Sequence, residues 1–169
     1  MDNSGDLVGS PLVGQEIGSF ISENSDVIDV AASYYAFSSY DNEIDEWTNY
    51  NPNSTDLFES GKGYAVATAS GNTMAFKGEV DVSANGIAYL GSNFLDNDYG
   101  GNQWMLVSNP YPSYIHANSN GNNVLNDFMT ENSDTMDPNY VAIYGWKQQD
   151  SYNYQVYNNI NQTPLYLAP

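Results

Sequence analysis

The chain has 169 residues, of which 41% are hydrophobic, so it is long and apolar enough to fold around a core. Twenty-one acidic residues stand against three lysines and no arginine. The formal net charge of -18 argues against nucleic acid, anionic membranes and polyanionic glycans as partners. The lack of cysteine excludes disulfides, a thiolate nucleophile and a zinc cluster built on thiolates.

The first part of the chain alternates short apolar segments with turns. Fifteen tyrosines, with many Asn, Ser, Thr and Gly residues, favour strands joined by turns. In chain order we expect a strand at Leu7–Val8, a short helix or turn within Ile17–Ile28, a hairpin of Ser33–Ser39 and Glu46–Asn51, strands at Gly61–Thr68 and Thr73–Val82, and a short strand at Ile87–Leu90.

The loop-like stretch Asp96–Asn102 is the expected seam before a second series of elements. These are a strand at Trp104–Ser108, an amphipathic helical turn carrying Val124, Leu125, Phe128 and Met129, and a hairpin of Tyr140–Trp146 and Tyr152–Asn158. No segment is long and apolar enough to suggest a membrane span. The acidic start, Asp2–Asp6, is unlike a signal peptide, and we expect the chain to be part of a longer protein.

Four blocks of sequence recur in the same order about one hundred residues later, which is typical of a duplicated unit. The matches are Leu7–Pro11 with Leu106–Pro110, Phe20–Asp26 with Phe128–Asp134, Ala36 with Ala142, and Trp47 and Tyr50 with Tyr154 and Tyr157.

The duplication predicts one all-β module over residues 1–169, a β-sandwich of two pseudo-symmetric repeats with a short helix in each. Repeat one covers about residues 5–95 and repeat two about residues 103–169. Repeat two stops at Leu165–Pro169, before a counterpart of Gly61–Tyr64. We therefore expect its last strand to be absent or supplied by a neighbouring polypeptide, leaving an edge open to strand addition.

The segment Trp104–Ile115, with the sequence WMLVSNPYPSYI, resembles a duplicated all-β module of large secreted proteins of marine flavobacteria. In that family the strand and turn precede a short helix and an aromatic hairpin, often just before a type IX secretion sorting domain. The resemblance covers nearly the whole chain, and Gly61–Tyr64 is related to the strand that follows the hairpin there. It implies an extracellular or cell-surface location, adjacent domains in the same polypeptide and, often, a polysaccharide as partner.

Aromatic residues on the two matched hairpins are the candidate ligand-binding residues. Tryptophan and tyrosine rings stack on the C–H faces of sugars, and neighbouring Asn, Gln and Asp bind hydroxyl groups. The alternative is that these rings fill the core and strengthen cross-strand pairs. The candidates are Trp47, Tyr50, Trp146, Tyr152 and Tyr154.

Acidic loops are candidate calcium sites, because hard cations prefer several oxygen ligands. Asp96 and Asp98 begin a calcium-loop-like stretch, but no glutamate follows at the twelfth position. The hairpin tip at Asp41–Asp45 offers carboxylates as well. Acidic loops are also commonly just solvated, so calcium is a weak expectation.

No catalytic arrangement is recognisable, and His116, the single histidine, has no triad or metal spacing around it. We therefore expect a non-catalytic carbohydrate-binding module that takes a neutral or weakly charged polysaccharide. The alternatives are a structural spacer or assembly module that binds no soluble ligand, and a small glycosidase or lyase with paired carboxylates.

Overall fold

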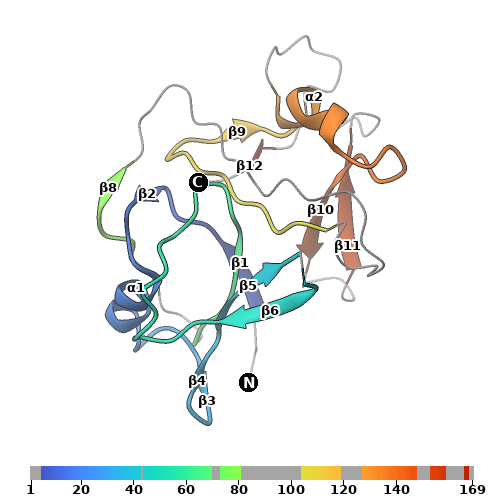
Figure 1. Cartoon of the computed structure of the whole chain (residues 1–169). Helices are drawn as coiled ribbons and strands as arrows, with labels where there is room; N and C mark the ends of the chain where they lie inside the picture. The colour runs from blue at the N-terminus through green and yellow to red at the C-terminus, as the bar shows by residue number, and fades with distance from the viewer. Residues whose placement is uncertain are drawn as a thin grey trace. The chain divides into compact units, whose positions relative to one another are not determined.

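A computed structural model of the chain describes residues 5–42, 44–69, 73–80, 104–118, 127–147, 153–158 and 166–167 (Figure 1). These residues form two compact units, the first within Met1–Pro112 and the second within Ser113–Ala168. They are mostly strand with two short α-helices, consistent with the predicted all-β class. Their sheets are small, so the β-sandwich and its pseudo-symmetric halves remain predictions. None of the helices they contain has the length and apolarity needed to cross a membrane.

The first unit is built on a four-stranded antiparallel sheet in the order β1-β7-β5-β6. The strands β5 and β6 are the predicted hairpin, with Tyr40 opposite Trp47. Apolar side chains alternate with smaller or polar ones along β5 and β7, so one face of the sheet is buried. The strands are β1 (Gly5–Val8), β5 (Phe37–Asp41), β6 (Glu46–Asn49) and β7 (Tyr64–Ala67).

Two further strand pairs lie in this unit. Ala32 adopts a positive φ of 61° in the turn between β3 and β4, and this short hairpin takes up the start of the predicted Ser33–Ser39 strand. Of the predicted Thr73–Val82 strand, the described residues form only a two-residue segment. The pairs are β2 (Leu12–Val13) with β8 (Glu79–Val80), and β3 (Val30–Ala31) with β4 (Tyr34–Tyr35).

Helix α1 (Ile17–Glu23) covers the buried face of the sheet and supplies three residues of the core. The ring of Phe20 stacks on Phe76 with centroids 4.6 Å apart and meets Phe58 edge-on at 5.3 Å. Such aromatic contacts add to the free energy gained from burying the rings. The buried cluster consists of Ile17, Phe20, Ile21, Ile28, Phe37, Tyr50, Phe58, Tyr64 and Val66.

The start of α1 is held by backbone groups from far along the chain. The N–H of Ile17 donates to the carbonyl of Asp56 (2.8 Å), and the N–H of Gly18 donates to the carbonyl of Ser54 (3.0 Å). The preceding Glu16 gives no side-chain cap. A Cβ at Gly18 would lie 2.3 Å from the Ser54 oxygen, so only glycine allows this close approach.

The second unit contains the second predicted hairpin and the described part of the second predicted helix, of which Val124 and Leu125 lie outside the described residues. Helix α2 is capped locally, because the carboxylate of Asp127 accepts hydrogen bonds from the N–H (2.7 Å) and hydroxyl (2.9 Å) of Thr130. The elements are α2 (Phe128–Asn132), the 3₁₀ turn η1 (Ser133–Thr135), the paired strands β10 (Ile143–Lys147) and β11 (Asn153–Tyr157), and the paired strands β9 (Ile115–His116) and β12 (Tyr166–Leu167).

The division between units differs from the sequence-based seam. Residues 104–112 belong to the first unit, whereas we expected them to open repeat two. The predicted strand Trp104–Ser108 makes one isolated bridge, between Val107 and Lys62. The predicted strand Ile87–Leu90 and the Asp96–Asn102 seam lie outside the described residues. Near the end of the predicted repeat two, Tyr166–Leu167 pairs with Ile115–His116.

Two local hydrogen bonds recur at matched positions of the sequence repeat. The side chain of Asn24 donates to the carbonyl of Phe20 (2.8 Å), and that of Asn132 donates to the carbonyl of Phe128 (2.7 Å). Asn24 is buried and also bonds to both backbone groups of Ala75, at 3.0 and 2.8 Å. The local bond therefore recurs in both units, while the long-range bonds of Asn24 belong to the first.

The turns that end the two Leu-Val segments are also alike. Ser10 Oγ accepts from the N–H of Leu12 (3.2 Å), and Asn109 Oδ1 accepts from the N–H of Tyr111 (2.9 Å). Both side chains are buried. A short polar side chain that bonds two residues ahead fixes such a turn, so Ser and Asn fill the same role here.

Candidate functional site

The outward face of the β5–β6 hairpin carries an aromatic pair. Tyr40 and Trp47 lie opposite each other across the two strands, with ring centroids 5.5 Å apart and a tilt of 55°. Phe37 and Ser39, on the other face of β5, are buried. Because side chains alternate along a strand, Tyr40 and Trp47 point away from the core, and Trp47 is 52% exposed.

Smaller side chains continue this face across the sheet. The register aligns Leu7 with Ala65, Ala65 with Ser38, and Ser38 with Asn49. Residues directly opposite each other share a face, so this row lies on the same side as Trp47. Asn49 is exposed and carries an amide that can donate and accept hydrogen bonds. The outward face therefore combines rings, small side chains and an amide.

The hydroxyl of Tyr40 is held at one end of this face. It donates a hydrogen bond to Asp45, which adopts a positive φ of 57° in the hairpin turn. Burial raises the pKa of the Tyr40 phenol to about 12, and the hydrogen bond to Asp45 and the negative charges of Asp45 and Asp41 act in the same direction. The ring is thus fixed at both its strand and its hydroxyl.

Tyr40 is absent from the residues selected by sequence, although the repeat contains a signal for it. The match of Ala36 with Ala142 places Tyr40 against Trp146, a selected residue. Aligning the hairpins strand by strand would have found it.

The second hairpin repeats the cross-strand arrangement. Trp146 lies opposite Tyr154, as Tyr40 lies opposite Trp47 in the first hairpin. Further along the second hairpin, Ile143 lies opposite Tyr157. The phenol of Tyr154 is 63% exposed. Trp146 is placed here by its strand register, since its side chain lies outside the description. Tyr152 falls outside the described residues altogether. In each hairpin the cross-strand pairs therefore fall at positions that the sequence repeat matches.

Tyr50 is a core residue, which corrects the stacking role expected for it. Its side chain is 8% exposed, and its ring lies near Phe37 and Tyr64, with centroids 6.3 and 6.2 Å away. Its N–H donates to the carbonyl of Phe37 (3.0 Å), which extends the hairpin ladder by one residue. The ring faces are therefore covered, and only the hydroxyl end reaches a cavity.

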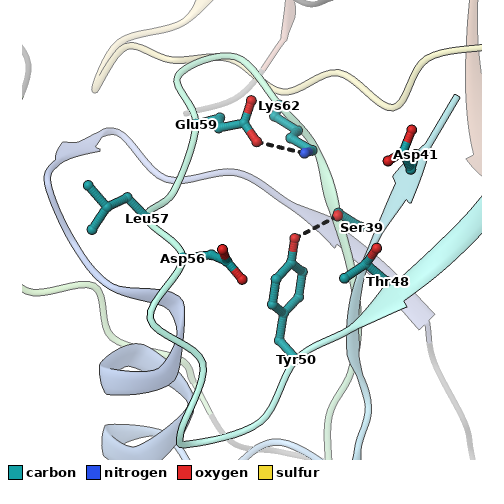
Figure 2. Close-up of a pocket in the computed structure, with 8 residues that line it drawn as sticks. All are labelled: Ser39, Asp41, Thr48, Tyr50, Asp56, Leu57, Glu59 and Lys62. Atoms are coloured by element: carbon teal, nitrogen blue, oxygen red, sulfur yellow. Dashed lines mark hydrogen bonds and ion pairs between the residues drawn. The ribbon is translucent and has the colours of Figure 1, made fainter. Parts of the chain in front are cut away.

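That cavity, which we call the hollow, has a volume of about 410 Å³ and lies on the inward side of the β5–β6 hairpin, where the apolar core ends. Figure 2 shows the Tyr50 hydroxyl directed at Ser39, and the two oxygens are 2.9 Å apart. Lys62 pairs with Glu59 at 2.7 Å beside them. The lining residues are Ser39, Asp41, Thr48, Tyr50, Asp56, Leu57, Glu59 and Lys62.

The hollow and the outer aromatic pair use opposite faces of the same two strands. Ser39 and Asp41 alternate with Tyr40 along β5, and Thr48 follows Trp47 along β6. A ligand in the hollow therefore meets hydroxyls and carboxylates, whereas a ligand on the outer face meets rings.

The described residues include no cluster of three or more His, Cys, Asp or Glu side chains that could hold a metal ion. Asp96 and Asp98 lie outside the description, so the weak calcium prediction stays a prediction. His116 lies in β9 with its ring 4.5 Å from that of Tyr166.

Comparison of the chain with protein-family models, with curated protein sequences and with solved structures gives no match.

Proposed function

We propose that the chain is a non-catalytic carbohydrate-binding module that attaches a larger protein, secreted or displayed at the cell surface, to a polysaccharide. The observation that carries this proposal is the aromatic cross-strand pair at the same register in both hairpins. Trp47 and Tyr154 are more than half exposed, so their rings are accessible for stacking on sugars. Two such pairs in one chain would allow a polymer to be held at two points.

The charge of the chain narrows the class of polysaccharide. A net charge of -18 repels sulfated and uronate-rich polymers. The Tyr40–Trp47 pair itself lies next to the carboxylates of Asp41 and Asp45. We therefore propose a neutral or weakly charged glycan.

Affinity electrophoresis tests the proposal. The full chain is run through gels that contain neutral polysaccharides (a β-glucan, a xylan, a mannan), with alginate as the anionic comparison. We expect retardation by at least one neutral polymer and about 10-fold weaker binding for Trp47→Ala. Trp104→Ala is the matched control, because Trp104 is an exposed tryptophan outside both hairpins. Absence of retardation in every gel, or an equal loss in both variants, would contradict the proposal.

We further propose that the two repeats are pseudo-symmetric halves of one β-sandwich. Support comes from Gly9 and Ser108, which occupy matched positions: a Cβ on Gly9 would lie 2.0 Å from Ser108 Oγ. Pro11 and Pro110, also matched, line one small cavity of about 90 Å³. Contacts between equivalent residues are typical of a pseudo-two-fold axis.

A structural spacer or assembly module is the second candidate, and one observation favours it. The backbone of Gly61–Gly63 pairs with Leu106–Ser108, through bonds of 2.9 Å and 2.8 Å, and so ties segments of the two repeats together. A spacer with this role needs no ligand. In that case no polysaccharide retards the chain and Trp47→Ala leaves its migration unchanged.

A further inference from the structure

We propose that the hollow behind the β5–β6 hairpin is a second binding site, which takes the hydroxyl groups of a single neutral sugar residue. This inference rests on the proposed function, because it assumes that the chain recognises glycans. It concerns a different face of the hairpin and a different chemistry from the outer aromatic pair.

The floor of the hollow provides a hydrogen-bond donor. Ser39 and Tyr50 are 2% and 8% exposed, and their hydroxyl oxygens are 2.9 Å apart. Two hydroxyls carry two hydrogens, and the bond between them uses only one. No acceptor for the second hydrogen is found in the part of the chain that the structure describes. A ligand oxygen at this place would satisfy a donor that is costly to leave unpaired.

The walls of the hollow provide acceptors. Asp56 and Glu59 carry carboxylates, which only accept hydrogen bonds when ionised, and Asp41 adds a third from the end of β5. Lys62 is the donor on this side, and it is already paired with Glu59. Asp56 and Tyr50 both line the hollow (Figure 2).

The combination of floor and walls selects the ligand class. A metal ion or an alkylammonium group could lie between carboxylates but could not accept the hydrogen from the floor. A carboxylate or sulfate could accept that hydrogen but would be repelled by three acidic walls. A sugar hydroxyl both donates and accepts, so neighbouring hydroxyls of one neutral sugar ring match both groups. A volume of about 410 Å³ lies in the range of small-ligand pockets.

A titration followed by NMR tests the site on the full chain. The probes are the methyl glycosides of glucose, mannose, galactose and xylose, with glucosamine, glucuronate and Ca²⁺ as charged comparisons. We expect saturable shifts of the amides of Ser39, Thr48 and residues 56–62 with at least one neutral glycoside. Glucuronate should give none.

Two variants and one control separate the possible outcomes. Tyr50→Phe keeps the buried ring and removes the hydroxyl, and Asp56→Asn alters an exposed carboxylate; each should weaken glycoside binding about 2- to 10-fold. Trp104→Ala, at an exposed tryptophan outside both hairpins, should leave it unchanged. The proposal is wrong if no neutral glycoside binds, including the case in which only glucosamine or Ca²⁺ binds. It is also wrong if Tyr50→Phe has no effect on binding.

The two proposals fail in different ways. Loss of polysaccharide retardation with glycoside binding intact would remove the polymer-binding function and retain the hollow. Retardation that depends on Trp47, in a chain whose hollow binds no glycoside, would retain the module and remove the second site.

Discussion

The β5–β6 and β10–β11 hairpins share a register but differ in what supports them. β5 and β6 belong to a four-stranded sheet whose inward face is sealed by α1, while the described residues place β10 and β11 in a two-stranded sheet. An isolated two-stranded hairpin is marginally stable in water. Equivalent sequence blocks therefore set the same local pairing, and the packing around them decides how much stability each contributes.

The largest effect is expected from truncating the matched phenylalanines of the two helices. Phe20 is fully buried among aromatic rings, so Phe20→Ala should lower the free energy of unfolding by about 3–5 kcal/mol. Phe128 is partly exposed, and Phe128→Ala should cost about 1–2 kcal/mol. Urea denaturation of both variants measures the difference. Equal losses would show that the second unit depends on its helix as much as the first.

The matched asparagines offer a second comparison. Asn24→Ala removes three hydrogen bonds and leaves the backbone groups of Ala75 unpaired, so we expect a loss of about 2–3 kcal/mol. Asn132→Ala removes its one bond to Phe128 and should cost about 0.5–1.5 kcal/mol. Thermal denaturation of the two variants checks the ratio. A larger loss for Asn132→Ala would contradict the assignment of long-range bonds to the first unit alone.

The matched positions Gly9 and Ser108 test whether the two Leu-Val segments meet. In Gly9→Ala the new methyl group would collide with the Ser108 side chain, and we expect a loss of about 1–3 kcal/mol. In the double variant, Ser108→Gly should relieve the collision. The remaining loss should be that of the 2.9 Å hydrogen bond that Ser108 donates to the carbonyl of Lys62. A double-mutant cycle measures this coupling. Strictly additive losses would mean that the two segments do not touch.

The smallest effect concerns the pH dependence of stability. It distinguishes the two hairpins, because the position of Tyr40 in the first is taken by Trp146 in the second. The pKa of Tyr40 and that of the buried Tyr64 are both raised to about 12, chiefly by burial. A raised pKa favours the neutral phenol, so this stabilisation is complete below about pH 10 and is lost as the pH rises towards 12.

Absorbance at alkaline pH follows this ionisation in the folded chain. The phenols of Tyr40 and Tyr64 should ionise later than an unperturbed tyrosine, and Tyr40→Phe should remove the contribution of Tyr40. If Tyr40→Phe leaves the late step unchanged, the phenol of Tyr40 is not held by Asp45 as described.

Local patterns in the sequence were sufficient for the elements that depend on nearby residues. The hairpins, the helix turn at Phe128 and the exposure of Trp47 follow from alternation and apolar spacing. Alternation also separates Trp47 from Tyr50, since residues three apart in a strand face opposite ways. The burial of Tyr50 was therefore within reach of the sequence, although we selected it as a ligand-binding residue.

Features that join distant segments could not be predicted in this way. The hollow takes its lining from residues 39–50 and 56–62, and no spacing rule relates Ser39 to Asp56. The pairing of Gly61–Gly63 with Leu106–Ser108 likewise brings into the first unit a segment that we predicted to open repeat two. Both depend on how the chain packs after its strands have formed.

The backbone anchor at the start of α1 has a consequence for the order of folding. Its first N–H groups find their acceptors at Ser54 and Asp56, more than thirty residues downstream. A seven-residue helix without a side-chain cap is unstable alone, because helix nucleation is unfavourable in short segments. During synthesis α1 is therefore stabilised only after Asp56 has left the ribosome. The first turn of α2, in contrast, is capped by Asp127, the residue directly before the helix.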